Sequence, residues 1–410
     1  MPNLRWLITE LARRLWVRAS IFAVAGIFTA VIGIALAPLI PAGWSGRIGA
    51  DSVDNVLQIL ASSMLAVTTF SLATMVSAYA TASSATTPRV AELLIQDSSA
   101  QNALGTFVGS FLFSLVGIIA LNAGVYGASG RVVLFVGTIG VIAVIVVTLL
   151  RWIDLLARFG RVGDAIDRVE AAAMQAMRAR WKDPCIDARM RAGPAPTVAA
   201  VTSAKIGYVQ HIDVEALEHL AAAAGGEIHV DALPGAFVDT ARPIAWLDFT
   251  PDEATRAAVC AAFNVGARRS FDQDPRFGLI VLSEIASKAL SPAINDPGTA
   301  IATMAALVRV LAILAEPREA ESEIVHPHVF IPALAVEDLF DDAFSPISES
   351  GAGTLAGGIR LQKILRALSA FHHPEFRAAA RHQSRLALAR ARHALALAED
   401  VARLTHEAVA

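Results

Sequence analysis

The first 150 residues contain four long stretches without a charged side chain. They cover residues 19–40, 55–80, 104–125 and 132–150. The hydrocarbon core of a bilayer is crossed by roughly 20 apolar residues of α-helix, so each stretch is long enough to cross it once. The buried helices of a soluble protein do not need four uncharged runs of this length. The pattern therefore predicts four transmembrane helices.

Charged residues are scarce in the chain and unevenly placed. Of the 410 residues, 17% are charged and 55% are hydrophobic, whereas a soluble protein averages about 25% charged. Beyond residue 150 the charge density becomes ordinary, and about 260 residues suffice for one or two globular domains. We therefore expect an α-helical membrane domain followed by an α+β cytoplasmic domain. The expected segments are an N-terminal segment (1–18), a membrane domain (19–152), a connecting helix and linker (153–200), a small β-rich subdomain (201–250) and a mainly helical domain (251–410).

Arginines are distributed asymmetrically around the predicted spans. Four precede the first span and four follow the last: Arg5, Arg13, Arg14, Arg18, Arg151, Arg158, Arg161 and Arg168. The two loops on the opposite side carry one arginine each, Arg47 and Arg131. Because loops rich in Lys and Arg stay in the cytoplasm, both termini are expected there. A cleaved signal peptide is disfavoured because the first run exceeds the usual length of about 7–15 residues and Pro38 would follow the cut directly.

The second span carries an unusual set of polar side chains. At about 100° per residue, these fall within roughly a third of the helix circumference: Asn55, Ser62, Ser63, Thr74, Ser77 and Thr81. Asn55, Ser62 and Thr69 also repeat every seven residues. One interpretation is that Asn55, Ser62, Thr69 and Ser77 line a pore. The other is that these side chains hold neighbouring helices together, because polar groups in lipid must find partners in protein or water.

Two further features of the spans bear on function. Small residues four apart, such as Gly105 and Gly109 in the third span and Gly26 and Ala30 in the first, allow helix backbones to approach closely. This packing suits a homo-oligomer as well as a monomer. No Asp, Glu, Lys, Arg or His lies within a span. Proton relays and coupled transporters usually need such a residue, so their absence counts against that class.

The part after the spans shows helical and strand-like patterns. Helices are expected at residues 161–182, 213–225 and 300–314, the last capped by Asp296 with Pro297 at its first position. Short strands are expected at residues 205–212, 227–230 and 244–249. Two helices, at residues 352–370 and 374–405, are expected to close the chain.

Several polar clusters could bind a ligand, although each also has a plain structural interpretation. The first comprises Asp272, Asp274, Glu284, Lys288, Asn295 and Asp296; a helix-turn-helix corner explains these residues equally well. His326 and His328 would share one face of a strand, but they lack the spacing of further ligands that a zinc site needs. The acidic patch Glu337, Asp338, Asp341 and Asp342 is either a solvated face or a cation site. No metal or cofactor is expected, and two cysteines imply no disulfide framework.

Some sequence blocks are distinctive enough to indicate a family. These are residues 203–217, 233–238, 268–278 and 290–297, together with Thr87-Pro88-Arg89 and Phe107-Val108-Gly109. With four spans, they resemble the uncharacterised bacterial membrane-protein family Domain of Unknown Function 2254. The resemblance covers nearly the whole chain. It implies a multi-pass protein of the bacterial inner membrane with a cytoplasmic domain, and it brings no established activity.

Three functional classes follow from these observations. The first is a channel-like homo-oligomer that passes ions or small solutes along the second span and has a cytoplasmic gating or regulatory domain. The second is a membrane-anchored structural or signalling module whose cytoplasmic domain binds a protein partner or a small ligand. A membrane-bound enzyme ranks last, because the sequence contains no recognisable nucleophile with a partnered base.

Overall fold

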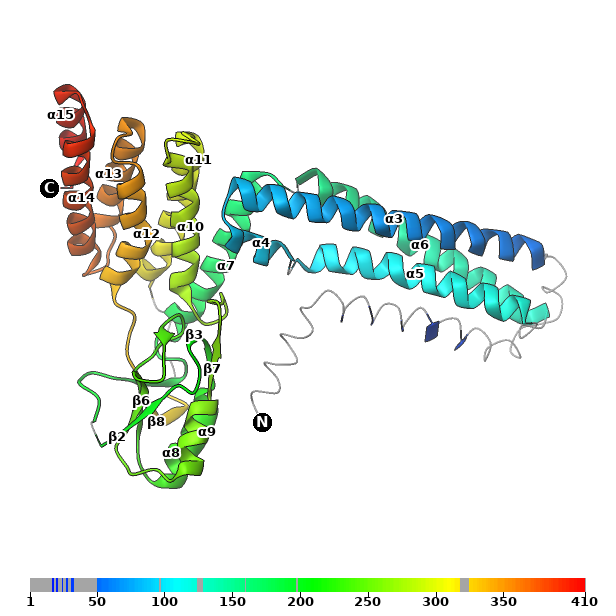
Figure 1. Cartoon of the computed structure of the whole chain (residues 1–410), viewed down its shortest axis with the longest axis horizontal. Coiled ribbons are helices and arrows are strands. Elements are labelled where there is room, and N and C mark those ends of the chain that lie inside the picture. The colour runs from blue at the N-terminus through cyan, green and yellow to red at the C-terminus, as the bar shows by residue number, and fades with distance from the viewer. Residues whose placement is uncertain are drawn as a thin grey trace. The chain divides into compact units, whose positions relative to one another are not determined.

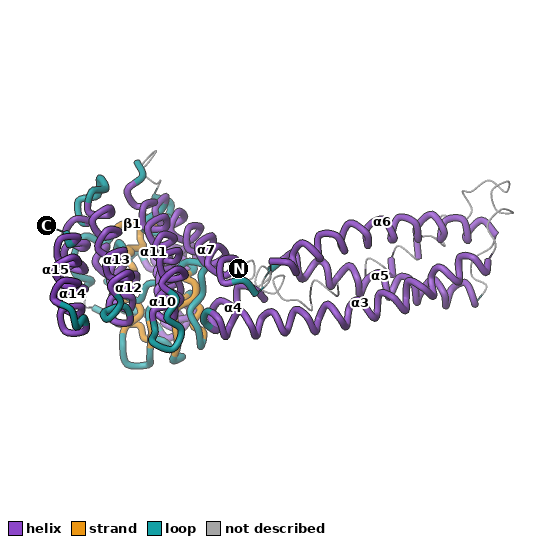
Figure 2. The backbone as a smooth tube through the Cα atoms, turned by 90° about the horizontal axis from the view of Figure 1, so that it is seen from above, coloured by secondary structure: helices purple, strands orange, loops and turns teal. Residues whose placement is uncertain are grey.

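The structure is a computed structural model that describes residues 50–95, 97–123, 128–158, 160–196, 198–317 and 324–409, with isolated positions 17, 20, 24, 27, 28, 31 and 32. The chain divides into two compact units between Asp164 and Ala165. Each unit is drawn in Figures 1 and 2. Apart from the isolated positions, the first predicted span, at residues 19–40, lies outside the described residues.

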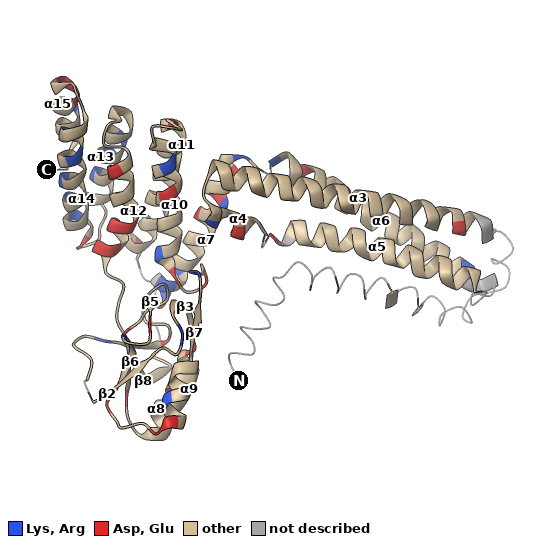
Figure 3. Ribbon diagram, in the orientation of Figure 1, with Lys and Arg blue, Asp and Glu red and all other residues tan. Residues whose placement is uncertain are grey.

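The first unit contains three long apolar helices. Its helices are α3 (Ala50–Ala85), α4 (Pro88–Ile95), α5 (Ser98–Asn122) and α6 (Ala128–Arg158). The long helices α3, α5 and α6 confirm the second, third and fourth predicted spans, since each is long and apolar enough to cross a bilayer. Their middle portions carry no charged residue (Figure 3).

Small and large apolar side chains pack the three long helices together. Leu57 and Phe107 are fully buried, and a Cβ atom on Gly117 would lie 3.1 Å from the Leu57 side chain. Glycine at this position therefore allows α3 and α5 to approach closely. At the other end of the pair, the Tyr79 hydroxyl donates a hydrogen bond of 3.1 Å to the carbonyl of Leu94, which ties α4 to α3.

The second unit contains two β-sheets. Its strands are β1 (Ala188–Met190), β2 (Ala199–Thr202), β3 (Gly207–Ile212), β4 (Ile228–Val230), β5 (Phe237–Val238), β6 (Pro243–Leu247), β7 (Phe263–Gly266) and β8 (His326–Ile331). The five-stranded sheet has the order β1-β8-β4-β6-β2, and the three-stranded sheet has the order β5-β3-β7. Pairing is antiparallel except at β1–β8 and β4–β8, which are parallel. The observed sheets therefore draw strands from outside residues 201–250.

Helices α7 (Val162–Lys182), α8 (Val214–Ala224) and α9 (Glu253–Ala261) accompany the sheets. The structure confirms the predicted helices 161–182 and 213–225 and the three predicted strands. Asp213 caps α8 by accepting a hydrogen bond from the backbone N–H of Ala216, and Gly225 ends it at φ 65°. That left-handed conformation favours glycine.

The remaining helices stand side by side in two rows that pack against each other (Figures 1 and 2). They are α10 (Pro275–Leu290), α11 (Pro297–Ala312), α12 (Val336–Ser350), α13 (Leu355–Ser369), α14 (Phe376–Ala394) and α15 (Ala398–Glu407). A short 3-10 turn, η2 (Ile313–Ala315), extends α11. The segment Pro297–Ala315 is apolar enough to cross a membrane, yet half of its most apolar window is buried inside the protein. Core packing thus accounts for its composition.

The predicted fold class is confirmed: long apolar helices precede a mixed α/β region with two sheets. The closing helix predicted at residues 374–405 is wrong, because the chain breaks between α14 and α15. This break lets α15 turn back onto α13. There, Leu404 lies against Gly358, and Arg366 forms an ion pair with Glu407.

Candidate functional site

The polar stripe predicted for the second span lies on the outer face of α3. Asn55, Ser62, Thr69 and Ser77 are all exposed. The buried residues of α3 lie about 180° away around the helix; they include Leu57, Met64, Ser71 and Met75. The stripe therefore points away from the face that packs against α5 and α6.

Small residues extend the stripe and large apolar residues border it. Ala66, Ala73 and Ala80 lie on the same exposed face. Ile59 and Phe70 flank it on one side, with 66% and 65% of their surfaces exposed. Leu65, Leu72 and Val76 flank it on the other. The result is a narrow band of small and polar side chains between two apolar borders.

The hydroxyl groups of the stripe donate hydrogen bonds to their own helix. Ser62 Oγ donates to the carbonyl of Gln58 at 2.9 Å, and Thr69 Oγ1 donates to the carbonyl of Ala66 at 2.9 Å. A hydroxyl has one donor and two acceptor lone pairs. With the donors used by the backbone, these two side chains offer acceptor oxygen atoms to whatever lies beside the helix.

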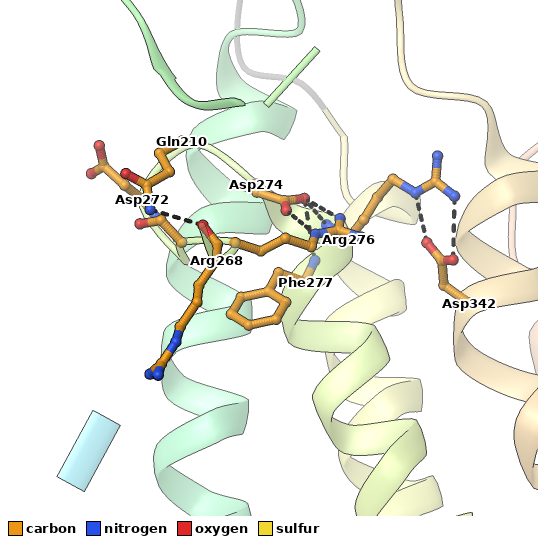
Figure 4. Close-up of polar contacts among 9 residues, drawn as sticks. Gln210, Arg268, Asp272, Asp274, Arg276, Phe277 and Asp342 are labelled. Atoms are coloured by element: carbon orange, nitrogen blue, oxygen red, sulfur yellow. Dashed lines mark hydrogen bonds and ion pairs between the residues drawn. The ribbon is translucent and has the colours of Figure 1, made fainter. Parts of the chain in front are cut away.

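A second cluster surrounds the start of α10 and is drawn in Figure 4. Asp274 is 1% exposed and accepts two hydrogen bonds from Arg269, at 2.7 and 3.0 Å. Its carboxylate also accepts hydrogen bonds from the backbone N–H groups of Arg276 and Phe277 and so caps the helix. Burial raises the pKa of Asp274, while the hydrogen bonds from Arg269 oppose that rise by stabilising the carboxylate.

Gly235 brings a distant sequence block onto this ion pair. Its φ is +90°, and a Cβ atom there would lie 2.3 Å from Oδ2 of Asp274 and 2.5 Å from Nη2 of Arg269. Only glycine fits this conformation and this space. Residues 233–238 and 268–278, two of the blocks that indicated a family, are therefore in direct contact in the fold.

Arg276 joins α10 to α12. Its guanidinium donates hydrogen bonds to Asp342 at 2.6 and 3.2 Å and to Asp338 at 2.7 Å. Figure 4 shows the Arg276 and Asp342 side chains facing each other. The acidic patch on α12 thus holds two helices together, which favours a structural role over a cation site.

The four predicted ligand-binding residues do not converge on one site. Asp272 faces His211, with 3.1 Å between Oδ2 and Nδ1, at the same end of α10 as Asp274. Asn295 and Asp296 follow the other end of this 16-residue helix, about 24 Å away by the rise of a helix. Asp296 caps α11 by accepting a hydrogen bond from the Thr299 N–H at 3.0 Å, as predicted. Any ligand binding would therefore involve two separate places.

The histidines of β8 are placed on a strand as expected. His328 pairs with Glu218, with 2.6 Å between Nδ1 and Oε1, and its backbone N–H donates to the same carboxylate at 2.9 Å. Within the described ranges, no group of three His, Cys, Asp or Glu side chains is arranged to hold a metal ion. A histidine of an inner strand that is paired with Glu218 explains the polar character of β8 without a metal.

Sequence reasoning missed a buried arginine on α7. Arg180 is 7% exposed, and its three guanidinium nitrogen atoms have no hydrogen-bond partner among the described residues. Burial lowers the pKa of Arg180, and the nearby carboxylates of Asp183 and Asp274 oppose this. Its position, three residues after the buried Met177, continues the spacing of the buried face of α7. That spacing could have identified it.

Comparisons with known proteins place the chain in a family. A family model described as "Predicted membrane protein (DUF2254)" matches residues 12–367. Uncharacterized proteins of Mycobacterium bovis and Mycobacterium tuberculosis are each 31% identical to this chain over 137 residues, which cover 32% of this chain. The chain spans about a quarter (26%) of the length of these curated relatives. No solved structure matches it.

The family model covers far more than half of the chain, and the apolar helices fit its description. The two blocks that meet at Gly235 and Asp274 lie within the matched range. The chain therefore belongs to the DUF2254 family of multi-pass membrane proteins of unknown function.

Proposed function

We propose that this protein is a channel-like homo-oligomer of the bacterial inner membrane. In each copy, α3 turns its polar stripe toward a shared water-filled path. Both termini face the cytoplasm, and the α/β unit acts there as a gating or regulatory domain. The observation that carries the proposal is the position of the stripe, which faces away from α5 and α6, the described helices against which α3 packs.

The depth of the stripe supports a role inside the membrane. The uncharged run of α6, residues 132–150, spans about 28 Å, close to the hydrocarbon thickness of a bilayer. Leu57 of α3 lies level with Gly117 of α5, near the end of the bundle where that run begins. Tyr79 of α3 lies beside Leu94, near the other end. Ser62 and Thr69 fall between these two levels, and hence near the middle of the membrane.

The chemistry of the stripe favours water and cations over anions. Ser62 and Thr69 offer acceptor oxygen atoms, because their donors are used by the backbone. Oxygen acceptors solvate cations and accept hydrogen bonds from water. We therefore expect small cations to pass more readily than anions of similar size.

Flux through liposomes tests the proposal. Full-length protein reconstituted in liposomes should dissipate a K⁺ gradient across the vesicle membrane. A K⁺-sensitive dye inside the vesicles measures the rate. Ser62→Leu and Thr69→Leu should each reduce the rate by about tenfold or more, since a bulky apolar side chain removes acceptors and narrows the path. Val144→Leu is the matched control, because Val144 is 54% exposed on α6, outside the stripe, and should leave the rate unchanged. Tight vesicles with wild-type protein would contradict the channel.

Cysteine accessibility separates a wet stripe from a dry helix contact. In a background with Cys185→Ala and Cys260→Ala, Ser62→Cys and Thr69→Cys should react with a membrane-impermeant thiol reagent, whereas Val144→Cys should not. If the stripe is instead packed against another helix, all three positions would stay unlabelled. That result would favour the anchored module, in which the spans only hold the α/β unit at the membrane.

A further inference from the structure

A cavity of about 300 Å³ lies between α5 and α6, at the end of the bundle where α6 leaves its uncharged run. Its polar lining comes from both helices: Ser99, Asn102 and Thr106 of α5, and Thr148, Arg151 and Arg158 of α6. This volume is at the lower end of those of known small-molecule sites. The pore proposal does not involve this cavity, since it lies away from α3.

The cavity stands at the depth of lipid phosphate groups. The uncharged run of α6 ends at Leu150, so Arg151 is the first charged residue beyond the hydrocarbon core at this end. Trp152 also lines the cavity, and indole rings prefer the membrane interface. Val144 and Val147 lie on the same face of α6, toward the middle of the membrane, and are 54% and 50% exposed, where acyl chains would contact them. A ligand with a charged head and apolar tails would meet both kinds of surface.

The charges around the cavity leave one positive charge in excess. Arg158 forms an ion pair with Asp154, which also lines the cavity. Arg151 has no ion-pair partner among the described residues. Two arginines and one aspartate sum to a net charge of +1, which one phosphodiester of charge −1 would neutralise. Arginine and hydroxyl groups are the donors that proteins commonly use for phosphate oxygen atoms.

We propose that this cavity binds the phosphodiester headgroup of an anionic phospholipid from the leaflet at this end of the bundle. Arg151 supplies the charge, and the side chains of Ser99 and Thr148 supply hydrogen-bond donors. The lipid tails lie along Val144 and Val147. Arg151, which has no ion-pair partner among the described residues, and the exposed apolar residues on the membrane side of the cavity favour a lipid over dissolved phosphate.

Native mass spectrometry of the full-length protein tests this site. Protein in detergent is titrated separately with phosphatidylglycerol, phosphatidylcholine and inorganic phosphate. Phosphatidylglycerol should bind more tightly than phosphatidylcholine, and Arg151→Gln should weaken its binding about fivefold, the value of one interfacial cation near an anionic lipid. Arg161→Gln is the matched control, because Arg161 is an exposed arginine that does not line the cavity. It should leave the binding unchanged.

Two further variants keep the test independent of a folding defect. Asp154→Asn removes the carboxylate found among the described residues that line the cavity, and it should tighten phosphatidylglycerol binding. Thr148→Leu fills the cavity without changing its charge and should weaken it. Equal binding of both lipids, or equal losses for Arg151→Gln and Arg161→Gln, would overturn the site. Displacement of the lipid by inorganic phosphate at similar concentrations would overturn the lipid as its ligand.

Discussion

The contact between Gly235 and the Arg269–Asp274 ion pair gives the sharpest prediction about the fold. The chain offers three glycines that separate two physical effects. Gly353 has neither a positive φ nor an atom near its hypothetical Cβ. Gly225 has φ +65° with open space around it, and Gly235 has φ +90° with two polar atoms within 2.5 Å. Replacement by alanine therefore adds no strain at Gly353, backbone strain alone at Gly225, and backbone strain with a steric clash at Gly235.

The expected destabilisation rises along this series. Gly353→Ala should leave the free energy of unfolding of the α/β unit nearly unchanged. Gly225→Ala should lower it by about 1–2 kcal/mol, the cost of a left-handed conformation for an L-residue. Gly235→Ala should lower it by about 1–3 kcal/mol more, because the ion pair or the turn must shift to admit the methyl group.

Thermal unfolding of full-length protein in detergent measures these differences. For a unit of this size, each kcal/mol lowers Tm by about 2–4 °C. Near-UV circular dichroism follows tertiary packing, and the same detergent and protein concentration keep the variants comparable. Equal Tm losses for Gly225→Ala and Gly235→Ala would show that the turn does not lie on the ion pair, and the account of the two converging blocks would be wrong.

Two other predictions concern helices α10 to α15. Arg276→Gln should lower the free energy of unfolding by about 1–3 kcal/mol because Asp342 loses its partner. Asp342→Asn should lower Tm more than Asp338→Asn, since the side chain of Asp342 is 17% exposed and that of Asp338 is 51% exposed. A larger Tm loss for Asp338→Asn would contradict the geometry. Hydrogen bonds from the Thr299 hydroxyl and N–H lower the pKa of Asp296 below 3.8, so its ionised form stabilises the fold above that pH and this contribution is lost as pH falls further. The Tm advantage of wild-type protein over Asp296→Asn should therefore shrink between pH 6 and pH 3, and a constant difference would refute this.

Local sequence patterns predicted those features that depend on one element at a time. Uncharged runs identified α3, α5 and α6, and the Asp-Pro pair identified the cap and start of α11. Alternating and apolar segments identified β3, β4 and β6. Each of these signals is contained within one helix or strand and its immediate neighbours.

Features that depend on distant partners could not be predicted in this way. Arg276 and Asp342 are 66 residues apart, and the sequence around either residue does not indicate the other as its partner. Strands β1 and β5 have only three and two residues, too few for periodicity to show. The break between α14 and α15 depends on where Leu404 packs against Gly358 of α13, which is a tertiary contact. For the same reason, the sequence suggested one ligand site for Asp272, Asp274, Asn295 and Asp296, although these residues lie at opposite ends of α10.

The direction of the stripe on α3 illustrates the same division. The sequence places Asn55, Ser62 and Thr69 on one side of a helix, but a helix alone does not determine which side meets its neighbours. Burial of Leu57 and Met75 settles that the stripe faces away from α5 and α6. Lipid is a poor neighbour for it, because polar side chains in hydrocarbon need partners for their remaining hydrogen-bonding groups.

The charges at the ends of α6 determine how deep each proposed site lies. Sliding the bundle by one helical turn, about 5.4 Å, would draw Arg131 or Arg151 into the hydrocarbon core. An arginine at the centre of a spanning helix costs about 2.5–3.5 kcal/mol on insertion scales, and less near its ends. The bundle therefore keeps one register, with Ser62 near the midplane and Arg151 at the phosphate level. Exchanging Leu150 and Arg151 in the sequence would move the charge inward and should weaken phosphatidylglycerol binding without closing a path along α3. Loss of flux in that variant would mean that the two sites are coupled.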